Sequence, residues 1–384
     1  MTAETGPGAR AERARTALRE AGGGTFVLAP GPNFRYCSGF ETEQSKRHTL
    51  LVLPAEGEAF FFVPSMFADE ALAASWVDAA ATWDDEDDPA AALADAFADR
   101  GVAGPLYVNE RMWTTFSLDV RDAFEASAGA APDLRRASDL LAPLRMVKEE
   151  TELAAVREAS GVADAVSRVI RGEVDLVGET ENAVAAELEY RMRRRGATGA
   201  SFETIVASGP NSGRPAHRAG DRTIEAGDPL ILDFGCVVDG YLSDQTRSTV
   251  VAADGPDDAP EGYAEVHAAV LDAQDAAVAA VEPGVEARDV DAAARAVLDE
   301  AGYGDLFPHV TGHGVGLDIH EPPFLVGGSY LGGFNEVELE PGMVFSVEPA
   351  VYTDDWGVRV EDLVVVTETG AERLNGSPYG WEPL

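Results

Sequence analysis

Short apolar runs alternate with amphipathic stretches over the first 142 residues. Four runs bounded by Gly, Pro or polar residues have the pattern of buried strands. They are residues 26–29, 50–53, 60–63 and 106–109. Residues 66–76 and 89–100 have the pattern of helices, and residues 137–143 that of a linker. Strands interleaved with helices favour a small α/β domain over residues 1–142.

A different pattern begins at residue 147. Apolar side chains at helical spacing predict a long helix over residues 148–171, and a second helix is expected over residues 180–195, ending at Gly196. The segments that follow have the pattern of strands, and then the order of elements repeats. The strands are expected at 204–207, 229–238 and 246–252, the next helices at 263–281 and 289–301, and the last strands at 343–352 and 358–366.

The two halves of this second region align with each other. Residues 178–196 match residues 284–302, with Gly at both ends of each segment. Residues 225–233 match residues 340–348, and both segments end on an acid. A repeated unit of two helices and two strands would bring paired acids together at a pseudo-dyad. Coincidence is the alternative, because Gly and Ala are abundant in this region.

Two aspartates give the first chemical signal. Asp233 lies inside an apolar strand, where a carboxylate is costly unless it is paired, protonated or bound to a metal. Asp244 follows beyond a turn at Gly240, as it would across a hairpin. The segment alone is also compatible with an ordinary hairpin that has one satisfied core aspartate and surface acids.

Histidines give the second signal. Three of the six, His309, His313 and His320, fall close together, and Gly flanks His313 on both sides. Gly lets the backbone approach a ligand closely, and imidazole is the commonest metal-binding side chain. The alternative is a Gly-rich loop with packed or hydrogen-bonded histidines.

Two glutamates complete a candidate ligand set, because Glu348 and Glu361 each lie within or beside an apolar strand. Together with Asp233, Asp244 and His313 they would supply four carboxylates and one imidazole. Carboxylates at close range raise one another's pKa, so the set requires cations, and two divalent ions would neutralise it. Oxygen-rich ligands with one nitrogen favour Mn, Co or Fe, with Zn as a further alternative.

These segments resemble the pita-bread metallopeptidases, which include methionine aminopeptidases, Xaa-Pro aminopeptidases and prolidases. The motifs are Asp-Phe-Gly, Gly-Tyr-x-Ser-Asp-x-Thr-Arg, Gly-His-Gly-x-Gly-Leu-x-x-His-Glu and Glu-Pro-Gly-Met-x-Phe-Ser-x-Glu-Pro. The resemblance covers roughly residues 147–370, and the family's ordered ligands Asp, Asp, His, Glu and Glu all match. Ala350 departs from the Gly that is usual after Glu-Pro.

The N-terminal region points to one branch of this family. Residues 33–40, followed by the apolar run after residue 49, resemble the smaller N-terminal domain of the Xaa-Pro and creatinase-like branch. The resemblance implies an α+β protein. A duplicated pita-bread (creatinase/aminopeptidase) catalytic domain over residues 147–384 would follow a smaller α/β creatinase-like N-terminal domain over residues 1–142.

The resemblance also assigns roles to the metal ligands. Asp244 and Glu361 are expected to bridge two divalent ions, Asp233 to serve one ion, and His313 and Glu348 to serve the other. The expected ion is Mn2+, with Co2+, Fe2+ or Zn2+ as alternatives. A metal-bridging hydroxide would attack the scissile carbonyl, and Glu348 would act as the general base.

Further residues match the family's substrate site. His217 matches a substrate-side histidine, His309 a proline-side histidine, and His320 the histidine that hydrogen-bonds the tetrahedral intermediate. Arg359 is expected to orient a carboxylate of the substrate or of Glu361. The alternative for His217 is an exposed loop residue.

The net charge of the chain indicates which partners and which salt environment to expect. Asp and Glu total 68 against 29 Lys and Arg, a net charge of -39 spread along the chain. Self-repulsion of this size is screened at molar salt, where the Debye length is about 3 Å. We therefore expect a halophilic protein from a salt-loaded cytoplasm; the alternative is an ordinary acidic protein with a basic partner. A nucleic-acid partner is not expected without a basic surface.

The expected cellular location follows from the lack of membrane-spanning and signal segments in the sequence. No apolar run is long enough for a membrane-spanning helix, and the N-terminus has no apolar signal core, so a cytoplasmic protein without a membrane partner is expected. Cys37 and Cys236 provide neither a disulfide framework nor a cysteine-based zinc site. Tyr241 and Tyr352 are expected to be packing residues.

The predicted activity is hydrolysis of Xaa-Pro bonds in a proline-containing peptide, by a dipeptidase or an aminopeptidase. Relatives with this N-terminal domain imply a homodimer. Two other classes stay open: a non-peptidase on the same scaffold, such as a metal-dependent dimethylsulfoniopropionate lyase, and a catalytically inactive binding module. Creatinase-like members without metal lose ligands, whereas all five positions are filled here.

Overall fold

Two compact units make up the chain in the computed structural model, which describes residues 5–252, 258–328 and 334–382. The first unit spans Met1–Arg145 and the second Met146–Leu384. In the described residues, no helix is both apolar enough and long enough to cross a membrane.

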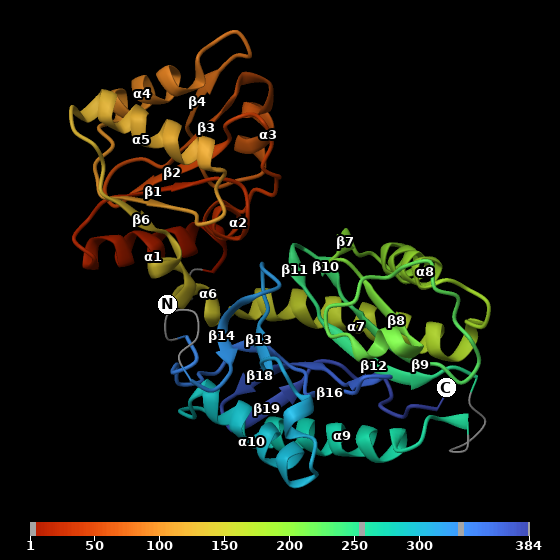
Figure 1. Ribbon diagram of the computed structural model, residues 1–384. Helices are drawn as coiled ribbons and strands as arrows, with labels where there is room; N and C mark the ends of the chain where they lie inside the picture. Colours follow the sequence, from red (N-terminus) through yellow and green to blue (C-terminus); the bar gives the residue numbers. More distant parts are fainter. Residues whose placement is uncertain (1–4, 253–257, 329–333, 383–384) are drawn as a thin grey trace. The chain divides into compact units, whose positions relative to one another are not determined.

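A six-stranded mixed sheet forms the centre of the first unit, with the strand order β4-β3-β2-β1-β5-β6 (Figure 1). The strands are β1 (Thr25–Leu28), β2 (Leu50–Pro54), β3 (Phe60–Pro64), β4 (Ala80–Trp83), β5 (Leu106–Val108) and β6 (Leu134–Arg136). β2 pairs antiparallel with β1 and β3, and the outer pairs are parallel. The predicted α/β character of this region is therefore confirmed.

Helices cover both faces of this sheet. They are α1 (Pro7–Glu20), α2 (Pro32–Ser38), α3 (Ala68–Ala73), α4 (Pro89–Arg100) and α5 (Thr114–Ala128), with the 3-10 turn η1 (Ser65–Phe67) before α3, and α6 (Ser138–Met146) follows β6. Phe60 and Phe62 pack with Phe97 of α4 and Phe116 of α5, whereas Phe61 contacts Phe34 of α2. Side chains alternate across a strand, so the Phe-rich strand β3 serves both faces.

The linker expected at residues 137–143 is wrong, because α6 occupies this segment. Leu141, Ala142 and Met146 are buried, and that burial favours a helix even though Pro143 lies inside it. Pro inside a helix removes one backbone hydrogen bond, so packing of the buried side chains offsets this cost in α6.

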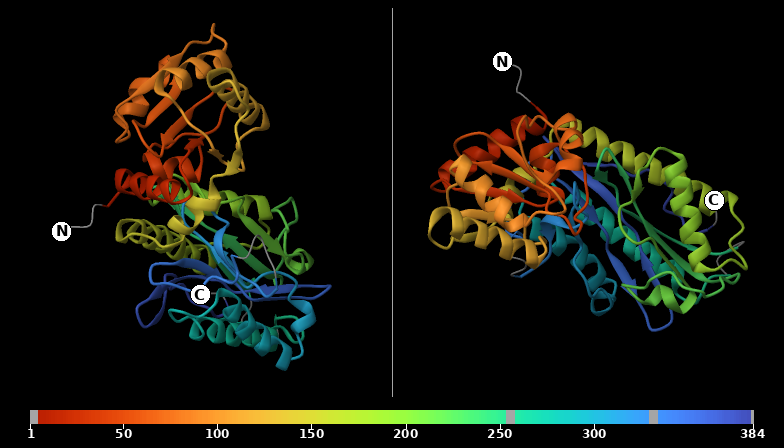
Figure 2. Two further views of the ribbon diagram at one scale, coloured as in Figure 1. Left: turned by 90° about the vertical axis from the view of Figure 1, so that its left-hand side faces the viewer. Right: turned by 90° about the horizontal axis from the view of Figure 1, so that it is seen from above.

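The second unit repeats one arrangement of helices and strands. The first half contains α7 (Glu150–Glu173), α8 (Glu181–Arg194), β7 (Gly199–Ala200), β8 (Ile205–Ser208), η2 (Gly209–Gly213), β9 (Pro229–Phe234), β10 (Cys236–Val238), β11 (Tyr241–Leu242) and β12 (Gln245–Val250). The second half contains α9 (Tyr263–Ala279), α10 (Ala287–Glu300), η4 (Gly304–Leu306), β13 (Gly312–Gly314), β14 (Glu321–Leu325), β15 (Val344–Val347), β16 (Ala350–Tyr352), β17 (Gly357–Arg359), β18 (Asp362–Thr367) and β19 (Gly370–Arg373). The helices of the two halves lie on opposite sides of the strands (Figure 1, Figure 2). The duplicated α+β fold is confirmed.

Three segments predicted as continuous strands are each interrupted next to a candidate ligand. The first breaks at Gly235, where an added Cβ would lie 1.8 Å from the Ser243 carbonyl oxygen. The second breaks after β15, at Glu348. The third breaks between β17 and β18, at Glu361. The second and third breaks leave Glu348 and Glu361 outside the regular strands, whereas Asp233 stays paired within β9 next to the first break.

A fully buried ion pair joins the two halves. Arg247 of β12 and Asp362 of β18 have no exposed side-chain surface and lie 2.8 Å apart. The Arg247 guanidinium also donates to the carbonyl of Glu361 at 2.7 Å, and an isolated bridge pairs Thr246 with Glu361. The seam between the halves therefore runs through the candidate ligand Glu361.

A second buried pair anchors the strand that follows His320. Lys148 Nζ lies 2.8 Å from Glu321 Oε1, with side chains 1% and 5% exposed. Nζ also donates to the Met146 carbonyl at 3.1 Å.

We expect Lys148→Met to lower the free energy of unfolding by about 3–5 kcal/mol, because it leaves the Glu321 carboxylate buried without its cation. Urea unfolding would measure the loss, and Lys46→Met, at the exposed second lysine, serves as the control. Adding Glu321→Gln to Lys148→Met should recover part of the stability. A single variant as stable as the wild type would contradict the prediction.

Candidate metal centre

Five candidate ligands come from five separate places in the fold. Asp233 lies in β9, Asp244 between β11 and β12, His313 in β13, Glu348 directly after β15 and Glu361 directly before β18. Four of them are at most 8% exposed, and the Glu348 side chain is 14% exposed. The structure thus gathers in one buried region the residues that the sequence spreads over both halves.

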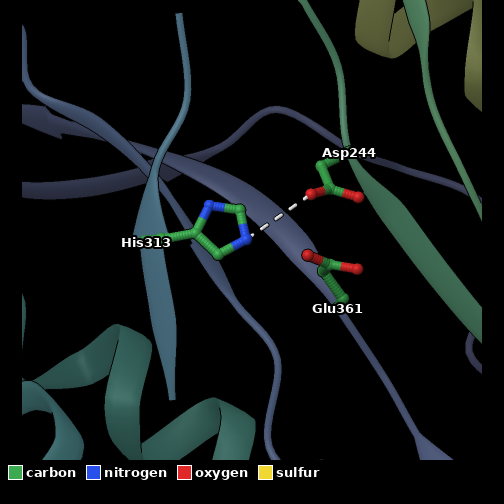
Figure 3. Close-up of side chains that lie close together, drawn as sticks. All are labelled: Asp244, His313 and Glu361. Atoms are coloured by element: carbon green, nitrogen blue, oxygen red, sulfur yellow. Dashed lines mark ion pairs between the residues drawn. The ribbon is translucent and has the colours of Figure 1, made fainter. Parts of the chain in front are cut away.

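Three of these side chains point toward one another. Asp244, His313 and Glu361 offer ligand atoms that all lie within 4.8 Å of one another (Figure 3). His313 Nε2 is 3.8 Å from Asp244 Oδ2 and 3.3 Å from Glu348 Oε1. Figure 3 shows the imidazole edge directed at the two carboxylates. This geometry suits a cation held between the halves.

Burial and like charge shape the electrostatics of the cluster. Burial raises the pKa of Asp244 and Glu361 well above the usual range, and neighbouring carboxylates raise it further. Burial acts on Glu348 in the same direction, but the hydrogen bond and charge of His313 outweigh it and bring the pKa of Glu348 to about 2. At His313 the Glu348 contact outweighs burial and raises the pKa to about 9. The acids thus need positive charge to ionise together.

Asp233 provides a direct test of whether the cluster fits a metal. Its Oδ1 atom is buried and accepts no hydrogen bond within the described residues, while Oδ2 pairs with Arg359. A buried carboxylate oxygen without a donor is costly, and a divalent cation would satisfy it. Four carboxylates and one imidazole form a donor set that Mn2+, Co2+ and Fe2+ accept. The residues therefore fit a divalent ion.

Arg359 connects Asp233 to His309. Its guanidinium pairs with Asp233 and donates to Tyr352 Oη at 2.6 Å, and Tyr352 Oη lies 3.1 Å from His309 Nε2. His309 Nδ1 is 2.8 Å from the Val310 carbonyl oxygen, so Nδ1 carries the hydrogen and Nε2 accepts from Tyr352. Burial lowers the pKa of His309 and raises that of Tyr352 to about 12, which agrees with this assignment.

Arg359 therefore orients Asp233, a different ligand from the expected Glu361. Its expected contact with a substrate carboxylate stays a prediction. Tyr352 was expected to be a packing residue, but its hydroxyl is a link in this hydrogen-bond chain. Sequence reasoning missed it because an aromatic residue in an apolar strand gives no sign of what its hydroxyl meets.

The other two histidines lie in different surroundings. His320 is exposed, and its ring centroid lies 4.4 Å from that of His313. His217 follows η2, and its Nε2 lies 2.7 Å from Glu181 Oε2 on α8. The loop of His217 reaches the centre through Pro215, whose carbonyl accepts from Arg359 at 3.4 Å. Glu181 was also missed, because an acid in the first turn of a helix commonly serves the helix dipole.

Comparison with known proteins gives matches over both units. Residues 154–368 match the metallopeptidase family M24, and residues 10–147 match the creatinase/prolidase N-terminal domain. A probable dipeptidase PepE of Mycobacterium tuberculosis is 38% identical over 375 residues, 95% of this chain and 93% of the relative. An Xaa-Pro dipeptidase of Pyrococcus furiosus is 39% identical over 261 residues, 68% of this chain and 71% of the relative. The crystal structure of a prolidase from Thermococcus sibiricus has a TM-score of 0.89 and 32% identity, and the match covers 99% of this chain and 100% of that chain.

Proposed function

The chain belongs to the metallopeptidase family M24, and from this premise we propose that it hydrolyses Xaa-Pro dipeptides with two divalent metal ions. The observation that carries the proposal is the buried cluster of Asp244, His313 and Glu361, with Glu348 3.3 Å from His313 and with Asp233 Oδ1 lacking a donor within the described residues. The relatives named as an Xaa-Pro dipeptidase and a prolidase support the choice of substrate.

In the proposed centre, Asp244 and Glu361 would be shared between two ions, Asp233 would serve one ion, and His313 and Glu348 would serve the other. When bound, divalent ions of this kind lower the pKa of water and polarise a carbonyl group. Mn2+ is the proposed ion, because the donor set is rich in oxygen and contains no thiolate.

The protein's own groups have four tasks in this proposal. Glu348 accepts a proton from the attacking water, and Ser346 Oγ holds its Oε1 at 3.1 Å. His320, exposed beside His313, donates a hydrogen bond to the developing oxyanion. His217 and His309 contact the substrate on either side of the scissile bond. Arg359 keeps Asp233 aligned through the guanidinium contact described above.

A substrate panel tests the proposal. The protein would be loaded with Mn2+ or Co2+ in molar KCl and offered Ala-Pro, Ala-Pro-Ala and Ala-Ala. We expect proline release from Ala-Pro, with less cleavage of the other two. Faster cleavage of Ala-Pro-Ala would assign an aminopeptidase, and faster cleavage of Ala-Ala would assign a general dipeptidase. Cleavage of none by folded, metal-loaded protein would refute peptidase activity.

The same panel separates the other classes. A dimethylsulfoniopropionate lyase would release acrylate from that compound and leave the peptides intact. An inactive binding module would retain peptides without turnover, and the complete ligand set argues against it. Homodimer formation and a cytoplasmic location stay predictions, and light scattering during size-exclusion chromatography would measure the first.

Thermal stability should rise from low to molar KCl, because salt screens the repulsion within a chain of net charge -39. Each kcal/mol gained raises the Tm by about 2–4 °C for domains of 150–250 residues. Calorimetry would measure the shift, and an uncharged osmolyte at matched osmolality controls for solvent exclusion. A Tm that falls with added KCl would contradict the proposed salt-loaded setting.

A further inference from the structure

Glu181 is a fully buried acid with a complete set of hydrogen-bond donors. It is the first residue of α8, and its side chain has no exposed surface. Oε1 accepts from Ser208 N at 2.8 Å, Ser208 Oγ at 2.8 Å and Asn211 Nδ2 at 3.0 Å. Oε2 accepts from Gly220 N at 3.1 Å and lies 2.7 Å from His217 Nε2. One carboxylate thus fixes both ends of the loop over residues 208–220 and the histidine within it.

The charge of Glu181 determines which imidazole nitrogen carries the hydrogen. Burial alone would raise the pKa of Glu181, but the hydrogen bonds from Asn211, His217 and Ser208 outweigh it and lower the pKa. An ionised carboxylate can only accept hydrogen bonds, so His217 Nε2 must donate. Nδ1 is then the nitrogen left for a substrate group.

The loop of His217 is also held from the side of the metal centre. Ser212 Oγ accepts from Gly357 N at 3.1 Å, and a Cβ at Gly213 would lie 2.7 Å from the Thr353 carbonyl oxygen. The Pro215 carbonyl accepts from Arg359, which contacts Asp233. A side chain on this loop therefore keeps a fixed place relative to the ligands.

The second half of the catalytic unit has a similar arrangement. Asp291 on α10 is 1% exposed, accepts from Thr311 Oγ1 at 2.7 Å and from Gly327 N at 2.9 Å, and pairs with Arg295. Arg295 in turn donates to the His309 carbonyl at 2.5 Å. In each half, a buried acid on the second helix holds the loop that carries a candidate substrate histidine.

We propose that Glu181 is a positioning residue that binds Nε2 of His217 and presents its Nδ1 to the substrate. The proposal rests on the proposed function, which places His217 at the substrate. A carboxylate partner of this kind fixes the tautomer and the ring orientation of a histidine, and removal of such outer partners in metal sites costs about 10–100-fold in activity.

A double-mutant cycle on Ala-Pro hydrolysis tests this role. Glu181→Gln should lower kcat/KM by about 10–100-fold, and Mn2+ stoichiometry should stay unchanged. In a His217→Ala background the same substitution should change kcat/KM by less than about twofold, because Glu181 then has no imidazole to position. Glu189→Gln, on the same helix and bonded to Thr204, is the matched control and should leave kcat/KM unchanged. Equal losses in both backgrounds would overturn the proposal.

A spectroscopic measurement on the wild-type protein tests which His217 nitrogen carries the hydrogen, even if Glu181→Gln does not fold. In wild-type protein labelled with 15N-histidine and loaded with Zn2+, the His217 signals are those missing from His217→Ala. Long-range 1H–15N spectra should show a hydrogen on Nε2 and, at high pH, an acceptor Nδ1. A neutral ring with its hydrogen on Nδ1 would overturn the proposal. This measurement uses no substrate, so a wild-type protein that cleaves no peptide would refute the proposed function separately.

Discussion

Replacement of Glu348 by Gln is expected to lower kcat for Ala-Pro hydrolysis by about 10²–10⁴-fold while the protein stays folded. Gln keeps the shape and one carbonyl oxygen of the side chain but cannot accept the proton of the attacking water. The wild-type carboxylate has an oxygen that can take up this proton, which the Gln amide does not offer.

The experiment must separate lost proton transfer from lost metal. Steady-state kinetics would give kcat and KM, and elemental analysis would give the Mn2+ content of each variant. Glu340→Gln, an exposed acid shortly before β15, is the control and should match the wild type. Full kcat at full metal occupancy in Glu348→Gln would remove Glu348 from the role of general base.

Removal of the divalent ions should abolish turnover and also lower the Tm. Ions bound only by the folded chain stabilise it by about 4 kcal/mol at a free concentration 1,000 times Kd. Without the ions, Asp244 and Glu361 are buried beside other acids, and this like-charge repulsion destabilises the folded chain. Chelation followed by dialysis should therefore give an inactive protein with a lower Tm, and added Mn2+ should restore both properties.

Two matched variants locate this effect. Asp244→Asn should lose most of the Tm rise on adding Mn2+, because it removes a carboxylate that the proposed centre shares between both ions. Asp239→Asn changes an exposed acid in the same hairpin, at a positive φ of 47° that Asn tolerates, and should keep the full rise. An equal rise in both variants would mean that Mn2+ stabilises the protein at another place.

Sequence reasoning could find some candidate ligands because they break a local rule, and the resemblance to a known family completed the set. An acid inside an apolar strand, as at Asp233, needs a special reason to be there, and His313 stands in a Gly-rich segment. Apolar periodicity also predicted the helices and strands, and their repeated order predicted the duplicated fold. The roles of the candidate ligands in catalysis stay predictions until variants are measured.

Other features depend on contacts between distant segments and leave no local signal. Glu181 has the pattern of an ordinary first-turn acid, yet its partners lie on a loop about thirty residues away. Apolar periodicity also located the strand around Glu348 but not its interruption, because a change of strand partner depends on tertiary packing. Residues 137–143 have the pattern of a linker in the sequence, but buried side chains hold them in the helix α6.

The buried pair of Arg247 and Asp362 has a consequence for how such a molecule could arise. If the two halves were separated, the Arg247 guanidinium and the Asp362 carboxylate would lose each other as partners. Each would then be exposed to water or buried as an unpaired charge. A polypeptide that contained only one half of the second unit would need a copy of itself to cover that surface. With both halves in one chain, this docking is intramolecular and does not depend on protein concentration.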